Sequence, residues 1–107
     1  MTSQRPPRDV QDTAQRALGW IEEGKAGKGF TDTGRYRADQ LASGEDVPMA
    51  EIHKMQQYFA RHEPDSKAEG FNADEEGFPS PGRVAWDAWG GDAGRRWCNK
   101  NQFTKDD

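Results

Sequence analysis

Large aliphatic side chains are scarce in this chain, and their scarcity limits the folds it can form. Only seven of its 107 residues are Ile, Leu or Val, and the five Phe bring these four types to 12. The chain also contains four Trp and two Tyr. So low a content of Ile, Leu, Val and Phe is typical of disordered chains when the net charge is large, but here the net charge is only −4. Because one aromatic side chain can bury about 150–250 Å², we predict a single folded domain with an aromatic core.

Apolar residues recur at helical spacing along the first half of the chain. The first stripe consists of Val10, Ala14, Ala17, Leu18 and Ile21. Asp9 is a suitable N-cap for this helix and Gly24 a suitable stop. A second helix is predicted over residues 32–43, and a third begins at Pro48 and ends before Pro64.

The second half of the chain shows a loop followed by two short helices. Residues 63–79 are acidic and rich in turn residues, and Phe71 and Phe78 are expected to anchor them to the core. Ser80-Pro81 is a strong helix start, because serine caps the helix and proline fits its first turn. Gly90-Gly91 then breaks this helix, and Asp92 is expected to cap the next.

No strand-like alternation is present, so we predict an all-α fold. It is a small bundle of four to five short helices with a helix-turn-helix-like central pair and an ordered acidic loop. We expect a flexible N-terminal arm over residues 1–9, a single helical domain over 10–101 and a frayed tail over 102–107.

Composition excludes several classes of protein. No apolar run approaches the roughly 18–20 residues of a membrane span, and the N-terminus does not resemble a secretory signal. A single cysteine, Cys98, cannot form an internal disulfide, and with only two histidines it forms no zinc cluster. We therefore expect a protein of a reducing cytoplasm with no membrane association, no cofactor and no metal.

Residues 35–61 carry the spacing of a helix-turn-helix motif. Ala42 would lie at the helix crossing, and Val47, Ile52 and Met55 follow it at 5, 10 and 13 residues. In the DNA-binding interpretation, outward side chains read base edges and arginines contact phosphates. The candidate DNA-binding residues are Arg35, Arg37, Ala50, His53, Lys54, Gln57 and Arg61.

Acidic residues weigh against that interpretation. Glu45, Asp46 and Glu51 would face the polyanion, and 15 basic residues against 19 acidic ones supply no overall cationic field. Two ordinary packed helices with a protein-facing or structural role are therefore favoured over a DNA reader.

The tryptophan-rich segment is the second candidate surface. At least two of Trp86, Trp89 and Trp97 are expected in the core, and Trp86 is the expected exposed partner anchor. The candidate protein-binding residues are Trp86, Arg95, Arg96 and Lys54. The glycine-rich turn at residues 90–94 could instead bind an anion, but Asp92 would repel it, so a helix-breaking corner is favoured.

The sequence offers nothing positive for catalysis. Cys98 has no evident His–acid constellation, which favours a half-buried packing thiol over a nucleophile. No acid–base pair stands out among the 19 carboxylates. We therefore expect no enzymatic activity and no small-molecule substrate.

Several segments together form a distinctive pattern. They read RYRADQLA from Arg35, YFARHE from Tyr58, GFPSPGRVAW from Gly77 and WGGDAGRRW from Trp89. Over about residues 13–99 the chain resembles a poorly characterised domain of tailed bacteriophages and prophages. That domain occurs alone or attached to head-morphogenesis proteins such as prohead proteases. Its relatives tend to start the third helix with Ser-Pro, where this chain has Val47-Pro48.

The resemblance implies a phage origin and action in the cytoplasm of an infected host, or association with the virion. We therefore expect a non-enzymatic accessory protein that binds a phage structural or host protein, in head assembly or as a host-directed factor. The alternative is a helix-turn-helix-like protein with DNA as its partner. Arg61 and Arg83 are expected to pair with Glu63 or Asp92 and to hold the acidic loop over the tryptophan helix.

Overall fold

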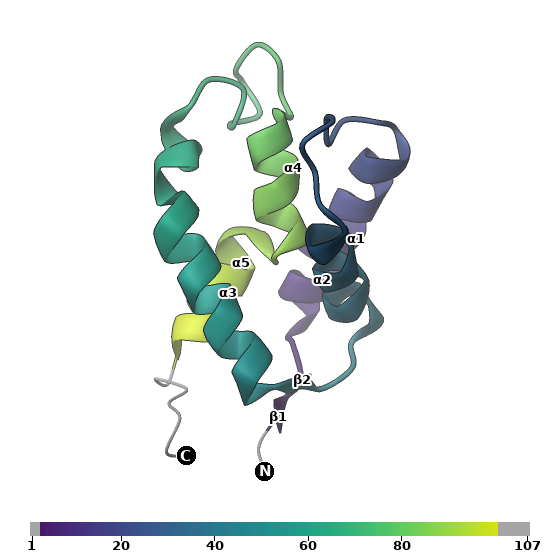
Figure 1. The fold of residues 1–107 in the computed structure, drawn as a ribbon, viewed down its shortest axis with the longest axis vertical. Helices are drawn as coiled ribbons and strands as arrows, with labels where there is room; N and C mark the ends of the chain where they lie inside the picture. The colour runs from purple at the N-terminus through teal and green to yellow at the C-terminus, as the bar shows by residue number, and fades with distance from the viewer. Residues whose placement is uncertain (1–2, 101–107) are drawn as a thin grey trace.

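Five α-helices account for most of the chain in a computed structural model, which describes residues 3–100 (Figure 1). They are α1 (Arg8–Glu22), α2 (Asp32–Ser43), α3 (Met49–His62), α4 (Pro81–Ala88) and α5 (Gly91–Asn99). A short 3₁₀ helix, η1 (Glu63–Lys67), continues α3. The predicted all-α bundle of short helices is confirmed. No helix among the described residues has the length and apolar character needed to cross a membrane.

Helix starts follow the local sequence at two of the predicted positions. The Ser80 hydroxyl accepts a hydrogen bond from the Arg83 backbone N–H at 3.1 Å, with Pro81 in the first turn of α4. Thr31 caps α2 in the same way, accepting from the Gly34 N–H at 3.2 Å. These side chains satisfy N–H groups that the first turn of a helix leaves without partners.

Two predicted caps are wrong. Asp9 lies inside α1, which begins one residue earlier and follows Pro7 without a side-chain cap. Asp92 lies in the first turn of α5, and the residue that precedes this helix is Gly90, with φ +109°. A Cβ at residue 90 would come within 2.8 Å of the Gly94 Cα, so this corner requires glycine.

The N-terminal segment differs from the expected flexible arm. Ser3–Gln4 (β1) pairs antiparallel with Val47–Pro48 (β2), and Pro6 is fully buried. The Gln11 amide donates to the Pro6 carbonyl at 2.8 Å, which ties the segment to α1. A pairing of two residues with two has no periodic pattern, so the sequence could not reveal it. The expected frayed tail, 102–107, lies outside the described residues.

Helix packing also departs from a helix-turn-helix pair. α2 packs mainly on α1, while α3 packs mainly on α5, with α4 between the two sides of the bundle (Figure 1). α2 and α3 touch at few positions, so they do not form the crossed pair that such a motif needs. Val47, Ile52 and Met55 are fully buried as predicted, but they pack into the common core.

The core is aromatic, as predicted. Trp86 lies at its centre with 1% of its surface exposed, and the rings of Tyr58, Phe59 and Phe71 surround it at centroid distances of 4.8–6.2 Å. The indole N–H donates to the Asp92 carboxylate at 3.0 Å, so the buried polar atom has a partner. The prediction that Trp86 is an exposed partner anchor is therefore wrong, because a core this poor in aliphatic residues uses its largest ring.

Candidate functional site

The predicted DNA-binding residues divide between surface and interior. On α3, Ala50, Lys54, Gln57 and Arg61 are exposed at helical spacing, so they share one face. His53 is half-buried. Lys54 lies 3.5 Å from the Glu51 carboxylate, which neutralises part of its charge.

The two arginines of α2 are engaged within the protein. Arg35 lies 3.5 Å from the Glu22 carboxylate on α1. Arg37 is only 2% exposed, and its Nη2 lies 2.7 Å from Oε1 of Glu51. The prediction that Arg37 lies near a DNA phosphate is wrong, because the side chain is buried between α2 and α3.

The predicted protein-binding residues do not form one surface feature. Arg95 and Arg96 are exposed on α5 and line a shallow hollow with Asp92 and Asn99, which does not include Lys54. Arg95 lies 5.8 Å from the Trp86 ring centroid, and Arg96 lies 3.9 Å from the Asp9 carboxylate. Both arginines therefore also contribute to local packing.

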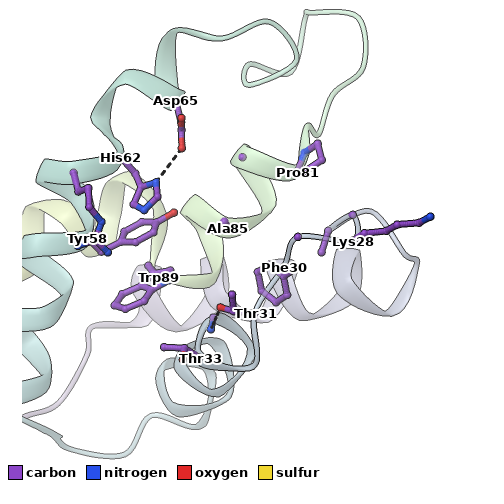
Figure 2. Close-up of a pocket in the computed structure, with 16 residues that line it drawn as sticks. Lys28, Phe30, Thr31, Thr33, Tyr58, His62, Asp65, Pro81, Ala85 and Trp89 are labelled. Atoms are coloured by element: carbon purple, nitrogen blue, oxygen red, sulfur yellow. Dashed lines mark hydrogen bonds and ion pairs between the residues drawn. The ribbon is translucent and has the colours of Figure 1, made fainter.

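A larger hollow of about 570 Å³ opens elsewhere, between α3, the start of α4 and the glycine-rich loop before α2 (Figure 2). We call it the aromatic groove. Its volume is in the range of ordinary ligand pockets, and most of its surface is apolar. The residues that define it here are Lys28, Phe30, Tyr58, Arg61, His62, Ala85 and Trp89.

Stacked rings build one wall of this groove. The Tyr58 ring lies parallel to the Trp89 indole at a centroid distance of 4.5 Å, and the His62 ring stacks on Tyr58 at 4.5 Å. The Arg37 guanidinium lies over the Trp89 ring at 4.8 Å, and His62 Nδ1 lies 3.1 Å from the Asp65 carboxylate. This stacked column, Arg37–Trp89–Tyr58–His62–Asp65, connects α2, α3, the end of α4 and η1.

Local sequence places each part of the column. Tyr58 and His62 are four residues apart on α3, so their side chains lie one above the other. Across the groove, Phe30 packs on Gly34 of α2, where a Cβ would come within 2.9 Å of the Phe30 ring. Glycine at residue 34 therefore allows Phe30 to lie against the helix and form the opposite wall.

The Tyr58 side chain presents a hydroxyl to the groove, whereas the fully buried side-chain atom without a partner among residues 3–100 is Arg37 Nε. Tyr58 is only 5% exposed, and its hydroxyl forms no hydrogen bond with any of residues 3–100. Figure 2 shows this hydroxyl between His62 and Ala85, inside the groove. Burial raises the pKa of Tyr58 well above its usual value, so the hydroxyl stays neutral and can donate at physiological pH.

Two cations at the rim form no ion pair within the part of the chain that the structure describes. Neither Lys28 nor Arg61 forms an ion pair with a described residue, whereas Lys25 in the same loop lies 3.4 Å from Glu23. The one carboxylate of the groove lining, Asp65, faces His62. The groove is therefore apolar inside and positive at its edges, although the whole chain carries a net charge of −4.

The arginine pairs that hold the acidic loop differ from those predicted. Arg83 Nε lies 3.1 Å from Asp87, and its Nη1 donates to the Phe71 carbonyl, while Arg16 reaches the same Asp87 at 2.6 Å. Burial raises the pKa of Asp87, and the two guanidinium groups oppose that shift. Arg83 thus fastens the loop to α4 through the Phe71 carbonyl, while its ion pair is with Asp87 of the same helix instead of with Glu63 or Asp92. Arg61 forms no ion pair with a described residue.

Groups for acid–base or nucleophilic chemistry are few in the described chain. Cys98 is fully buried, and burial raises the pKa of its thiol to about 12, so it is protonated at neutral pH. Beside the His62–Asp65 pair, the described groove lining offers no Ser or Cys. Residues 3–100 contain no cluster of three or more His, Cys, Asp or Glu side chains suited to a metal ion.

Sequence reasoning missed the groove. Its walls come from three segments that are distant in the sequence, around Phe30, Tyr58 and Trp89. No spacing of residues in the sequence indicates that these segments lie close together in the fold. One signal was present, since Tyr58 and His62 lie at helical spacing with Asp65 three residues further on. Comparison of the chain with known protein families, curated proteins and solved structures finds no match.

Proposed function

We propose that this chain is a non-enzymatic protein-binding module that receives its partner in the aromatic groove. The observation that carries the proposal is the apolar, ring-lined hollow itself, into which the Tyr58 hydroxyl faces without a hydrogen bond to any of residues 3–100. A bound segment would accept a hydrogen bond from this hydroxyl in place of water and would cover the apolar walls of Phe30 and Trp89.

The resemblance to a domain of tailed phages and prophages supports a setting for this function. We propose an accessory role in a phage-infected bacterium, in which the partner is a phage structural protein or a host protein. Head assembly and a host-directed role are both compatible with a small binding module.

DNA binding is the second candidate, and the exposed stripe of Ala50, Lys54, Gln57 and Arg61 favours it. The paired state of Lys54 and the burial of Arg37 weigh against it. A DNA reader would lose affinity steeply between about 50 and 200 mM salt, whereas an interface with an apolar core loses much less.

A capture experiment with two matched variants tests the proposal. Tagged wild type, Ala85→Phe and Ala50→Phe are each incubated with lysate of phage-infected bacteria, with and without nuclease. Ala85→Phe fills the groove, while Ala50→Phe makes the same change on the exposed face of α3. Thr33→Trp, an exposed position of the groove lining, serves as a second blocking variant if Ala85→Phe does not fold.

The proposal predicts a protein that survives nuclease and is retained by wild type and Ala50→Phe but lost with the blocking variant. Equal capture by the blocking variant would refute the groove as the binding site. Recovery of DNA, lost with Ala50→Phe, would establish the second candidate and exclude the first.

A further inference from the structure

We infer that the aromatic groove takes an acidic peptide segment of the partner, in which one bulky apolar side chain is flanked by carboxylates. This inference rests on the proposed function and specifies the partner's chemistry.

The interior of the groove calls for an apolar side chain. Its lining is mostly apolar, with Phe30 on one side, the Trp89–Tyr58 stack on the other and Ala85 between them (Figure 2). The hollow is partly open to solvent, so a side chain can enter from an exposed peptide. Aromatic and long aliphatic side chains in such a pocket supply much of the affinity of protein interfaces.

The positive charge at the rim favours acidic residues on both sides of the inserted side chain. Lys28 and Arg61 stand on two different segments at the edge of the groove, and neither has an acidic partner among residues 3–100. The Lys28 side chain extends away from the hollow in Figure 2, so it would meet the flanks of a bound peptide and not the inserted residue. Carboxylates on both flanks complement these two cations.

The Tyr58 hydroxyl adds a directional contact. The hydroxyl faces into the groove, and a backbone carbonyl or carboxylate of the peptide can accept a hydrogen bond from it. A peptide whose flanks are basic would instead place its cations beside Lys28 and Arg61, where like charges repel.

Synthetic peptides test the inference directly. Fluorescein-labelled peptides carry a central Phe, Leu or Ser between flanks of Glu, Lys or Ser, and fluorescence anisotropy measures their affinity for the protein. We expect Glu-flanked peptides with Phe or Leu to bind about tenfold more tightly than Ser-flanked ones, and Lys-flanked ones to bind most weakly. A central Ser should abolish binding, and Tyr58→Phe should weaken the Glu-flanked peptide a few-fold.

Charge reversal supplies the specific control. The double variant Lys28→Glu/Arg61→Glu should bind the Glu-flanked peptide about tenfold more weakly than wild type and the Lys-flanked peptide more tightly. The matched double variant Lys25→Glu/Arg35→Glu changes net charge equally at two cations that pair with Glu23 and Glu22 outside the groove lining. This control should bind the peptides in the same order of affinity as the wild type.

The outcomes separate the inference from the proposed function. If Ser- or Lys-flanked peptides bind as well as Glu-flanked ones and Ala85→Phe abolishes that binding, the groove receives protein segments but the acidic preference is wrong. If Ala85→Phe leaves the binding of every peptide unchanged, the groove is not the docking site and both fail. If no peptide of the panel binds, the inference of an acidic peptide segment is overturned. The capture experiment then decides separately whether the groove binds a protein.

Discussion

The rings of Tyr58 and Trp89 lie parallel, with centroids 4.5 Å apart and planes inclined by 1°. This contact joins α3 to the end of α4 and forms a wall of the aromatic groove. The other face of the Tyr58 ring is covered by His62, and the other face of the Trp89 ring by the Arg37 guanidinium. The groove wall is therefore part of the packed structure, while the Tyr58 hydroxyl bonds to none of residues 3–100.

Tyr58 should separate stability from binding. Tyr58→Phe keeps the stacked ring and removes a hydroxyl that bonds to none of the described residues, so the free energy of unfolding should change by less than about 0.5 kcal/mol. Tyr58→Ala removes the ring and should cost about 3 kcal/mol. Urea unfolding measures both changes. A large loss in Tyr58→Phe would show that the hydroxyl has a structural role.

The Arg37–Glu51 pair should make stability depend on acid. Partial burial raises the pKa of Glu51, but the hydrogen bond and charge of Arg37, with Lys54, outweigh it and bring the pKa below its ordinary value of 4.5. A carboxyl whose pKa is lower in the folded state contributes stability above pH 4.5, and that contribution is lost as pH falls through the folded value.

Glu51→Gln should therefore lower the free energy of unfolding by about 2–3 kcal/mol at pH 7, because Arg37 loses its buried counter-charge. The difference from wild type should shrink as the pH falls below 4.5. Urea unfolding at a series of pH values measures it, and Glu69→Gln at an exposed position is the matched control. A deficit that stays constant down to pH 3 would contradict the assignment.

Arg83 should hold the acidic loop in a way that lysine cannot reproduce. Its guanidinium contacts Asp87 and donates to the Phe71 carbonyl at the same time, which requires a fork of donors. Arg83→Lys should cost about 1–3 kcal/mol and speed proteolysis within residues 63–79. Arg96→Lys, at an exposed position, should change neither. Unchanged cleavage of the loop in Arg83→Lys would refute the role of Arg83.

Cys98 should be unreactive in the folded protein. Since burial raises the pKa of its thiol to about 12, the reactive thiolate is nearly absent at pH 8. Mass spectrometry should find slow alkylation by iodoacetamide in buffer and rapid alkylation in urea. Equal rates in the two conditions would mean that the thiol is accessible, and would reopen the case for a nucleophile.

Local signals explain which parts of the fold the sequence predicts. Ser80-Pro81 sets the start of α4 and Gly44 follows the end of α2, because caps depend on residues within one turn. The scarcity of aliphatic residues correctly predicts an aromatic core. The β1–β2 pairing joins residues more than forty positions apart, and no residue type near Ser3 predicts this pairing.

Tertiary contacts explain the errors. The sequence places Arg37 on a helix but does not show that Glu51 of the next helix faces it, so burial of an arginine could not be foreseen. The sequence does not show which of three tryptophans lies deepest, because local spacing carries no information on burial, so the prediction for Trp86 is wrong. The aromatic groove depends on the same kind of information, since Phe30, Tyr58 and Trp89 meet only after the helices pack.

The most direct test of the central claim follows the indole N–H resonances of the four tryptophans while ¹⁵N-labelled protein is titrated with the Glu-flanked Phe peptide. Trp89→Phe identifies the groove resonance. We predict that the Trp89 signal and the backbone amides of Lys28 and Phe30 shift together, while the Trp97 signal and the amides of Lys54 and Gln57 stay in place. Shifts confined to Lys54 and Gln57, with Trp89 unmoved, would contradict the groove as the binding site.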